Sequence, residues 1–358
     1  MAGCGANLAL DYQFLCDKNA AWGIVLETLA AAGVVATILL LLILFCLIPR
    51  TSNFNKRSII PIQIIFLLGT LGIFGLTFAF IIRMNDQTCP TRFFLFGVLF
   101  AICFSCLLVH AFKLISLVRG QQGIGWCLML MAVFALSMVQ IIIAIIWVVI
   151  ELARNGMPCN FLTNSEENYI QLNENFVYIL IYVLFLMALT FLVSMVTFCG
   201  CNSNWKIHGV NIFLTMLFSI CIWIVWIVML LRGNRQLGHG HMWDDPVISI
   251  ALVSNGWVFI IFYLIPEFIY LTRNPAEFPK DCAPTQPHLL RQTGGVENRV
   301  FGQDDCQDDD SGRCSPSSQP RFDSLQMKDL EDTKEFTIPR PHPVPWVQYR
   351  THDHTLGR

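Results

Sequence analysis

Residues 93–117 read FFLFGVLFAICFSCLLVHAFKLISL and are the clearest indication of the fold class of this chain. The only charged side chain of this stretch is Lys113, which lies close to its end. A helix needs about 20 mostly apolar residues to cross the roughly 30 Å hydrocarbon core of a bilayer, because lipid offers no hydrogen-bond partner to the backbone. The stretch is therefore predicted to be a transmembrane helix.

Six further runs meet the same requirement: residues 22–47, 59–82, 126–150, 176–198, 210–231 and 247–271. The sequence thus predicts an all-α membrane protein with a bundle of seven transmembrane helices. Its parts are a short extracellular N-terminus (1–21), the seven-helix bundle (22–271) and a disordered cytoplasmic tail (272–358). The first run is expected to act as an uncleaved anchor, because no secretory signal peptide precedes it.

Composition supports a membrane protein and excludes several functions. Hydrophobic residues make up 55% of the 358 residues and charged residues 13%, whereas soluble domains carry roughly 25% charged residues. A net charge of −2 gives no indication of nucleic-acid binding. The chain lacks a paired HxxxH, a GxSxG elbow and a phosphate-binding glycine loop, so we expect neither an enzyme nor a cofactor or metal site.

Charges near the ends of the runs predict the orientation. One side carries Arg50, Lys56, Arg57, Lys113, Arg119, Lys206, Arg273 and Lys280, and the other carries Lys18, Arg83, Arg92, Arg154, Arg232 and Arg235. This modest bias places the N-terminus outside and the long tail inside.

The tail is rich in Pro, Ser, Gln, Asp and Gly, so it cannot form a core. Its candidates for phosphorylation are Tyr349, Ser315, Ser317 and Ser318, and kinases or adaptors are the expected partners there. The alternative is that these residues belong to an ordinary soluble linker.

Aromatic residues in the last two runs are the first candidates for a binding site. Trp223, Trp226 and Trp257 could line a ligand pocket between helices. Ordinary packing and interfacial anchoring explain them too, and that interpretation is favoured. Trp223 is the best pocket candidate, because it lies too deep for an interfacial belt.

Two acids lie inside the predicted spans. Glu27 is expected either to contact Asn255 or another polar group, or to reach outward to water. Glu267 follows Pro266, which should kink the seventh span. For Glu267, accepting hydrogen bonds from nearby loops is preferred over a role in coupling at the inner face.

Four of the 14 cysteines are predicted to face the oxidising side: Cys4, Cys16, Cys89 and Cys159. Three pairings of four cysteines are open, as is the alternative of free thiols.

Several segments between residues 14 and 275 closely resemble one family, the orphan retinoic-acid-inducible, or group 5, receptors of class C. They are LCD at 15–17, AWGIVLE at 21–27, FGLTFAF at 74–80, TRFFLFGVLF at 91–100, CFSCLL at 103–108, YVLFLMALTF at 182–191 and WDDP at 243–246. In the tail, GVENR at 295–299 and EFTIPR at 335–340 resemble the retinoic-acid-induced subgroup.

This resemblance implies a receptor of the plasma membrane and of intracellular vesicles, linked to epithelial growth control and tail tyrosine phosphorylation. Seven-helix receptors commonly tie the second outer loop to the third span, which suggests a Cys89–Cys159 disulfide; Cys4 and Cys16 could close a second loop. The sequence departs from class C in two respects. The N-terminus is too short for a ligand-binding domain, and no acid at the start of the sixth span could pair with Lys113.

Three hypotheses for function follow. The leading one is an orphan class C-like G-protein-coupled receptor that acts on G proteins or other cytoplasmic signalling proteins, as a monomer or as a homo- or heterodimer among membrane lipids. The second is a ligand-independent membrane scaffold whose tail recruits kinases or adaptors. A transporter or channel is least favoured, because no repeat or central ionisable pair is evident. The activating ligand is not identified by the sequence.

Overall fold

The structure is a computed structural model that describes residues 21–51, 54–82, 88–121, 123–155, 166–199, 203–238 and 243–272. Cys4, Cys16 and Cys159 lie outside these residues. The tail with its phosphorylation candidates lies outside them as well.

The regular elements of the described residues are all helical. In chain order they are α1 (Ala21–Leu47), η2 (Ile48–Arg50), α2 (Phe54–Arg57), α3 (Ile60–Ile81), α4 (Thr88–Val118), α5 (Trp126–Asn155), α6 (Glu166–Ile179), α7 (Ile181–Val196), α8 (Ser203–Val228), η3 (Met229–Gly233), α9 (Asn234–Gln236), α10 (Asp244–Val258), η5 (Phe259–Leu264) and α11 (Ile265–Thr272).

Within these residues, six helices are long and apolar enough to cross a membrane. The pair α6 and α7, bent by 46°, brings the number of spans to seven when counted as one. The predicted seven-helix fold is thus confirmed. The fifth span differs in detail from the prediction: its first helix begins at Glu166, well before residue 176, and the span is broken at Leu180 instead of continuous.

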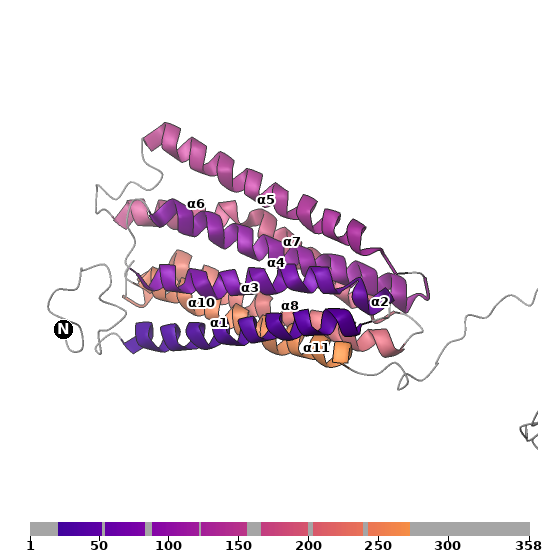
Figure 1. Ribbon diagram of the computed structural model, residues 1–358. Coiled ribbons are helices and arrows are strands. Elements are labelled where there is room, and N and C mark those ends of the chain that lie inside the picture. The colour runs from indigo at the N-terminus through magenta and orange to yellow at the C-terminus, as the bar shows by residue number, and fades with distance from the viewer. Residues whose placement is uncertain are drawn as a thin grey trace, which may run out of the picture. The chain divides into compact units, whose positions relative to one another are not determined.

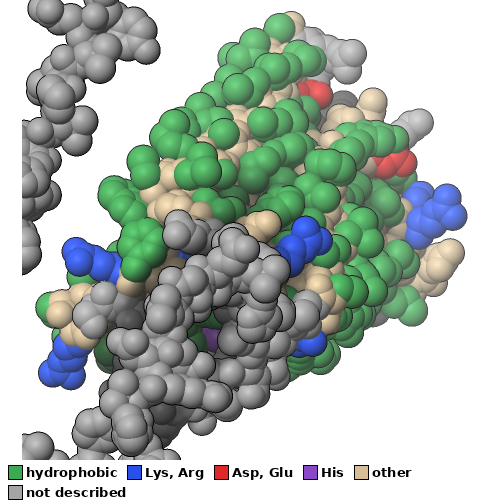
Figure 2. Space-filling view, turned by 90° about the vertical axis from the view of Figure 1, so that its right-hand side faces the viewer, with side chains coloured by type: hydrophobic (Ala, Val, Ile, Leu, Met, Phe, Trp, Pro, Cys, Tyr) green, Lys and Arg blue, Asp and Glu red, His purple; other side chains and the backbone are tan. Residues whose placement is uncertain are grey.

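The long helices lie side by side (Figure 1). The most apolar part of α4 is 78% buried, whereas those of α1 and α5 are 17% and 22% buried. Helix α4 is therefore the centre of the bundle, and α1 and α5 lie at its periphery with broad apolar faces toward lipid. Figure 2 shows hydrophobic side chains covering the flanks, with several Lys and Arg side chains around the end that faces the viewer.

The seventh span is helical throughout but changes its winding. Residues Phe259–Leu264 form a π-helical segment between α10 and α11. Pro266 follows in the first turn of α11 and has no N–H to donate to the preceding turn. The wider π turn is a common accompaniment of such a disturbed ladder. It sets the direction in which α11 presents Glu267.

Candidate functional site

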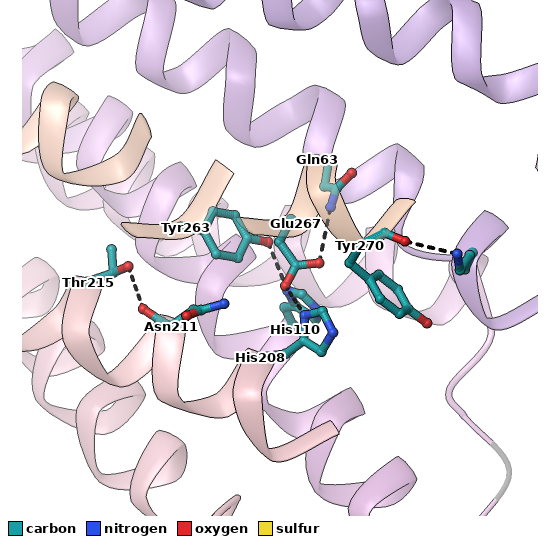
Figure 3. Close-up of polar contacts among 9 residues, drawn as sticks. Gln63, His110, His208, Asn211, Thr215, Tyr263, Glu267 and Tyr270 are labelled. Carbon is teal, nitrogen blue, oxygen red and sulfur yellow. Dashed lines mark hydrogen bonds and ion pairs between the residues drawn. The ribbon is translucent and has the colours of Figure 1, made fainter. Parts of the chain in front are cut away.

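Glu267 is the centre of a buried polar cluster at the end of the bundle that carries α2, predicted above to be cytoplasmic. Its side chain is fully buried. Its Oε1 lies 2.6 Å from Nδ1 of His208 in α8, and its Oε2 lies 3.5 Å from Nε2 of Gln63 in α3. Figure 3 shows both partners directed at the carboxylate. One acid thus joins three helices.

A second polar pair lies beside this carboxylate. Nδ1 of His110 in α4 is 2.8 Å from the hydroxyl of Tyr263 in η5, and both side chains are buried (Figure 3). Tyr263 precedes Glu267 by four residues, so the two share a face of the seventh span. Nε2 of His110 and Oε1 of Gln63 have no hydrogen-bond partner. We call Gln63, His110, His208, Tyr263 and Glu267 the Glu267 cluster.

Two lysines attach the short helix α2 to this region. Lys113 of α4 is fully buried and donates to Asn55 O at 3.0 Å and to Ser58 Oγ. Lys56 of α2 donates to Tyr270 O in α11 at 2.9 Å and lies 4.6 Å from the centre of the Tyr270 ring. Helix α2 therefore links α4 to α11.

The predicted pocket tryptophans fall into two places. Trp223 and Trp226 are buried with ring centroids 5.3 Å apart, and Trp223 packs edge-on against Phe100 at 5.0 Å. Their indole nitrogens have no hydrogen-bond partner. Trp257 lies elsewhere, half-buried, and its Nε1 donates to Leu29 O of α1 at 3.3 Å. Packing thus accounts for the three positions, and a ligand-binding role stays a prediction.

Among the described residues, no hydrogen bond joins Glu27 and Asn255, the two polar candidates for the ligand pocket. Glu27 in α1 is half-buried, and its side chain makes no hydrogen bond to another residue that the structure describes. Asn255 in α10 is fully buried and donates to Ala251 O in its own helix at 2.8 Å.

At the opposite end, the first turn of α10 holds a second polar group. Asp244 accepts hydrogen bonds from Asn173 of α6 at 2.8 Å and from Asn234 of α9 at 2.7 Å. Asp245 lies 3.6 Å from Nη1 of Arg92 in α4. Cys89, one turn before Arg92, is disulfide-bonded. Its predicted partner Cys159 lies outside the described residues, so that pairing stays a prediction.

Sequence reasoning missed most of the Glu267 cluster. His208 precedes residue 210, where the sixth span is predicted to begin, whereas α8 already begins at Ser203. The expected loop donor to Glu267 is therefore a helical residue that ties two spans together. The signal that could have found the cluster is the presence of Gln63 and His110 inside apolar runs, since polar groups in lipid are costly without partners.

Comparisons with known proteins bear on the whole bundle. A profile of the family described as "7 transmembrane sweet-taste receptor of 3 GCPR" matches residues 16–267. The chain is 46% identical over 351 residues to human retinoic acid-induced protein 3, covering 97% of this chain and 96% of the relative. It is 49% identical over 306 residues to the mouse protein of that name, covering 85% and 84%. It is 42% identical over 321 residues to bovine G-protein coupled receptor family C group 5 member C, covering 85% and 72%.

Proposed function

This chain belongs to group 5 of the class C family of seven-helix receptors, and on that premise we propose that it transmits a change in its helix bundle to a G protein. The observation that carries the proposal is the Glu267 cluster. It joins α3, α8 and α11 at the end predicted to face the cytoplasm, where a G protein would bind. A signal that separates these helices must first break the Glu267–His208 contact.

The energetics of that contact suit a two-state device. A buried carboxylate is stable only while its partners are in place, and losing one partner costs several kcal/mol. The bundle therefore stays in one arrangement until a ligand or partner that binds a second arrangement more tightly shifts the equilibrium toward it. Removing the carboxylate charge of Glu267 should lower the free energy needed to separate α8 from α11. Signalling in the absence of a ligand should therefore rise.

We propose the plasma membrane as the site of action, with the N-terminus outside and the tail inside, and vesicles as a second location. Modulation of epithelial growth and differentiation is part of the proposal, on the basis of the family resemblance. We also propose that the chain forms dimers with itself or with related receptors, since class C receptors commonly dimerise. Kinases or adaptors at the tail remain proposed partners.

A panel of G-protein activation assays in cells tests the proposal. The intact chain, a chain truncated after Thr272 and the variant Trp223→Ala are compared at equal surface expression. We expect activation of at least one G-protein class by the intact and the truncated chain. We expect altered activation by Trp223→Ala, because Trp223 fills the centre of the aromatic core.

The rival function, a ligand-independent scaffold, gives the opposite pattern. It requires that a membrane-tethered tail alone retain most of the cellular effect and that no nucleotide exchange follow from any intact chain. That outcome would reject the receptor proposal.

A further inference from the structure

The fifth span is broken at Leu180, although its sequence contains no residue known for breaking helices. Helix α6 ends at Ile179, α7 begins at Ile181, and their axes differ by 46°. Residues 166–196 include neither Pro nor Gly. Sharp kinks otherwise arise where a side chain or water inserts into the hydrogen-bond ladder. A side chain from another helix is therefore the cause to look for.

Gln140 of α5 supplies that side chain. It is fully buried, and its Nε2 donates to the carbonyl oxygen of Ile179 at 3.2 Å. In a continuous helix this carbonyl would accept from the N–H of Val183. The ladder instead tightens, with Leu180 N bonded to Val177 O at 3.0 Å, and resumes with Leu184 N bonded to Leu180 O at 2.9 Å. Gln140 thus satisfies a carbonyl for which lipid offers no partner.

The neighbouring helices are shaped to admit Gln140. Gly97 of α4 faces it, and a Cβ added at Gly97 would lie 2.6 Å from Gln140 Nε2 and 3.3 Å from a methyl group of Leu180. A second inter-helix bond, from the Tyr182 hydroxyl to Leu136 O at 2.9 Å, fastens the start of α7 to α5. Helix α7 is thereby fixed to α5 on one side of the break, and Gln140 holds the last carbonyl of α6 on the other side.

The direction of α6 decides which contacts it makes at the opposite end of the bundle. Phe176 stacks on Phe93 of α4 with centroids 4.3 Å apart and lies 6.0 Å from Trp226. Asn173 donates to Asp244 in the first turn of α10 at 2.8 Å. The bend therefore brings α6 against both the aromatic core and the first turn of the seventh span.

We propose that Leu180 is a hinge in the fifth span and that Gln140 is the latch that holds it bent. When the Gln140–Ile179 bond breaks, the Ile179 carbonyl pairs with Val183 N–H and the two helices align. The arm from Leu180 to Gln171 is nine residues long at about 1.5 Å each, so a change of 46° moves its tip by roughly 10 Å. Asn173 and Phe176 then leave Asp244 and Trp226. This motion requires no partner protein.

Distance measurements between spin labels test the hinge. The labels are attached through an introduced keto amino acid, which avoids the native cysteines, and the whole chain is studied in lipid nanodiscs. One label replaces the exposed Gln171 of α6, and the second replaces either Val25 of α1 or Leu152 of α5, which are 53% and 51% exposed. We expect the proposed movement of α6 to change at least one of the two distances.

Two variants, one in α5 and one in α4, weaken the Gln140–Ile179 hydrogen bond. Gln140→Leu removes the donor at similar size, and Gly97→Ala displaces it from α4. Both should add a population whose distance differs from that of the parent by several ångströms, up to roughly 10 Å as estimated above. Ser137→Ala is the matched control, because Ser137 is buried in the same helix and its hydroxyl has no hydrogen-bond partner. It should keep the parent distances.

Unchanged distances in both latch variants would overturn the proposal. So would failure of both variants to fold while Ser137→Ala folds normally, since Gln140 would then be a structural strut and not a latch. If only Gln140→Leu fails to fold, the distances of Gly97→Ala decide between the two outcomes.

Discussion

Glu267 of α11 and His208 of α8 bring a carboxylate oxygen and a ring nitrogen to 2.6 Å, with only 1% and 4% of their side chains exposed. The contact bridges the last two membrane spans. A carboxylate left alone in such a place would cost several kcal/mol. The relative position of the two helix ends therefore depends on both residues together.

A double-mutant cycle measures this dependence. Glu267→Gln, His208→Gln and the double variant are compared with the parent by thermal unfolding in nanodiscs. Average inter-helix hydrogen bonds in membranes contribute about 0.6 kcal/mol, and breaking a buried charged pair costs about 3–5 kcal/mol. We expect a coupling energy above about 1 kcal/mol, because both partners are almost fully buried. Strictly additive single effects would contradict a direct contact.

A second prediction concerns the ring of Phe74 in α3, which lies between two glycines of neighbouring helices. A Cβ would lie 2.3 Å from this ring at Gly33 of α1 and 2.5 Å from it at Gly256 of α10. We expect Gly256→Ala to destabilise the bundle by about 1–3 kcal/mol through overpacking. Adding Phe74→Leu should recover part of the loss in the same thermal assay.

Gly75 is the control for this prediction. It neighbours Phe74, yet a Cβ there would meet nothing within 4 Å. Gly75→Ala should leave stability unchanged or raise it slightly, since Ala favours the helix. A loss as large as that of Gly256→Ala would show that the cost is not steric.

A third prediction concerns α2 and the buried Lys113. Its ammonium group is bonded to Asn55 O and Ser58 Oγ, so Lys113→Met should release α2 from α4. We expect faster amide hydrogen exchange in residues 54–58, with exchange in the middle of α4 unchanged. Lys206→Met, at a half-buried position near the start of α8, is the control and should not alter α2. Equal protection of α2 in all three proteins would contradict this role.

The fold was predictable because each membrane span must be a helix of mostly apolar residues, and such a run can be found in the sequence without knowledge of the rest of the fold. Length and apolarity located all seven spans, and α4 is the most buried of the six continuous ones. The break in the fifth span could not be found in this way. Its cause is Gln140, which lies 39 residues before Ile179 in the chain, and nothing in residues 166–196 themselves indicates a break.

The site was predictable only in part, for a similar reason. Trp223 was predicted to lie deep in the sixth span, and the structure buries it beside Trp226. The partners of Glu267 were not predicted, because His208 lies just before the apolar run and so resembled a loop residue. Pair partners are set by how helices pack, and a single sequence carries no direct record of that packing.

The predicted orientation has its own test. Epitope tags at the two chain ends are examined in intact and in permeabilised cells. We expect an N-terminal tag to be accessible in intact cells and a C-terminal tag only after permeabilisation, because Lys and Arg are in excess on the tail side. Accessibility of both tags in intact cells would contradict an odd number of spans.

The role of the Glu267 cluster in signalling is tested by measuring nucleotide exchange on purified G protein, driven by the chain in nanodiscs without ligand. Glu267→Gln is compared with the parent, and Glu174→Gln makes the same chemical change at an exposed position of α6. We expect faster exchange with Glu267→Gln and parent-like exchange with Glu174→Gln. Exchange that is equally slow with all three proteins, at matched amounts of folded chain and across the G-protein classes, would contradict this role.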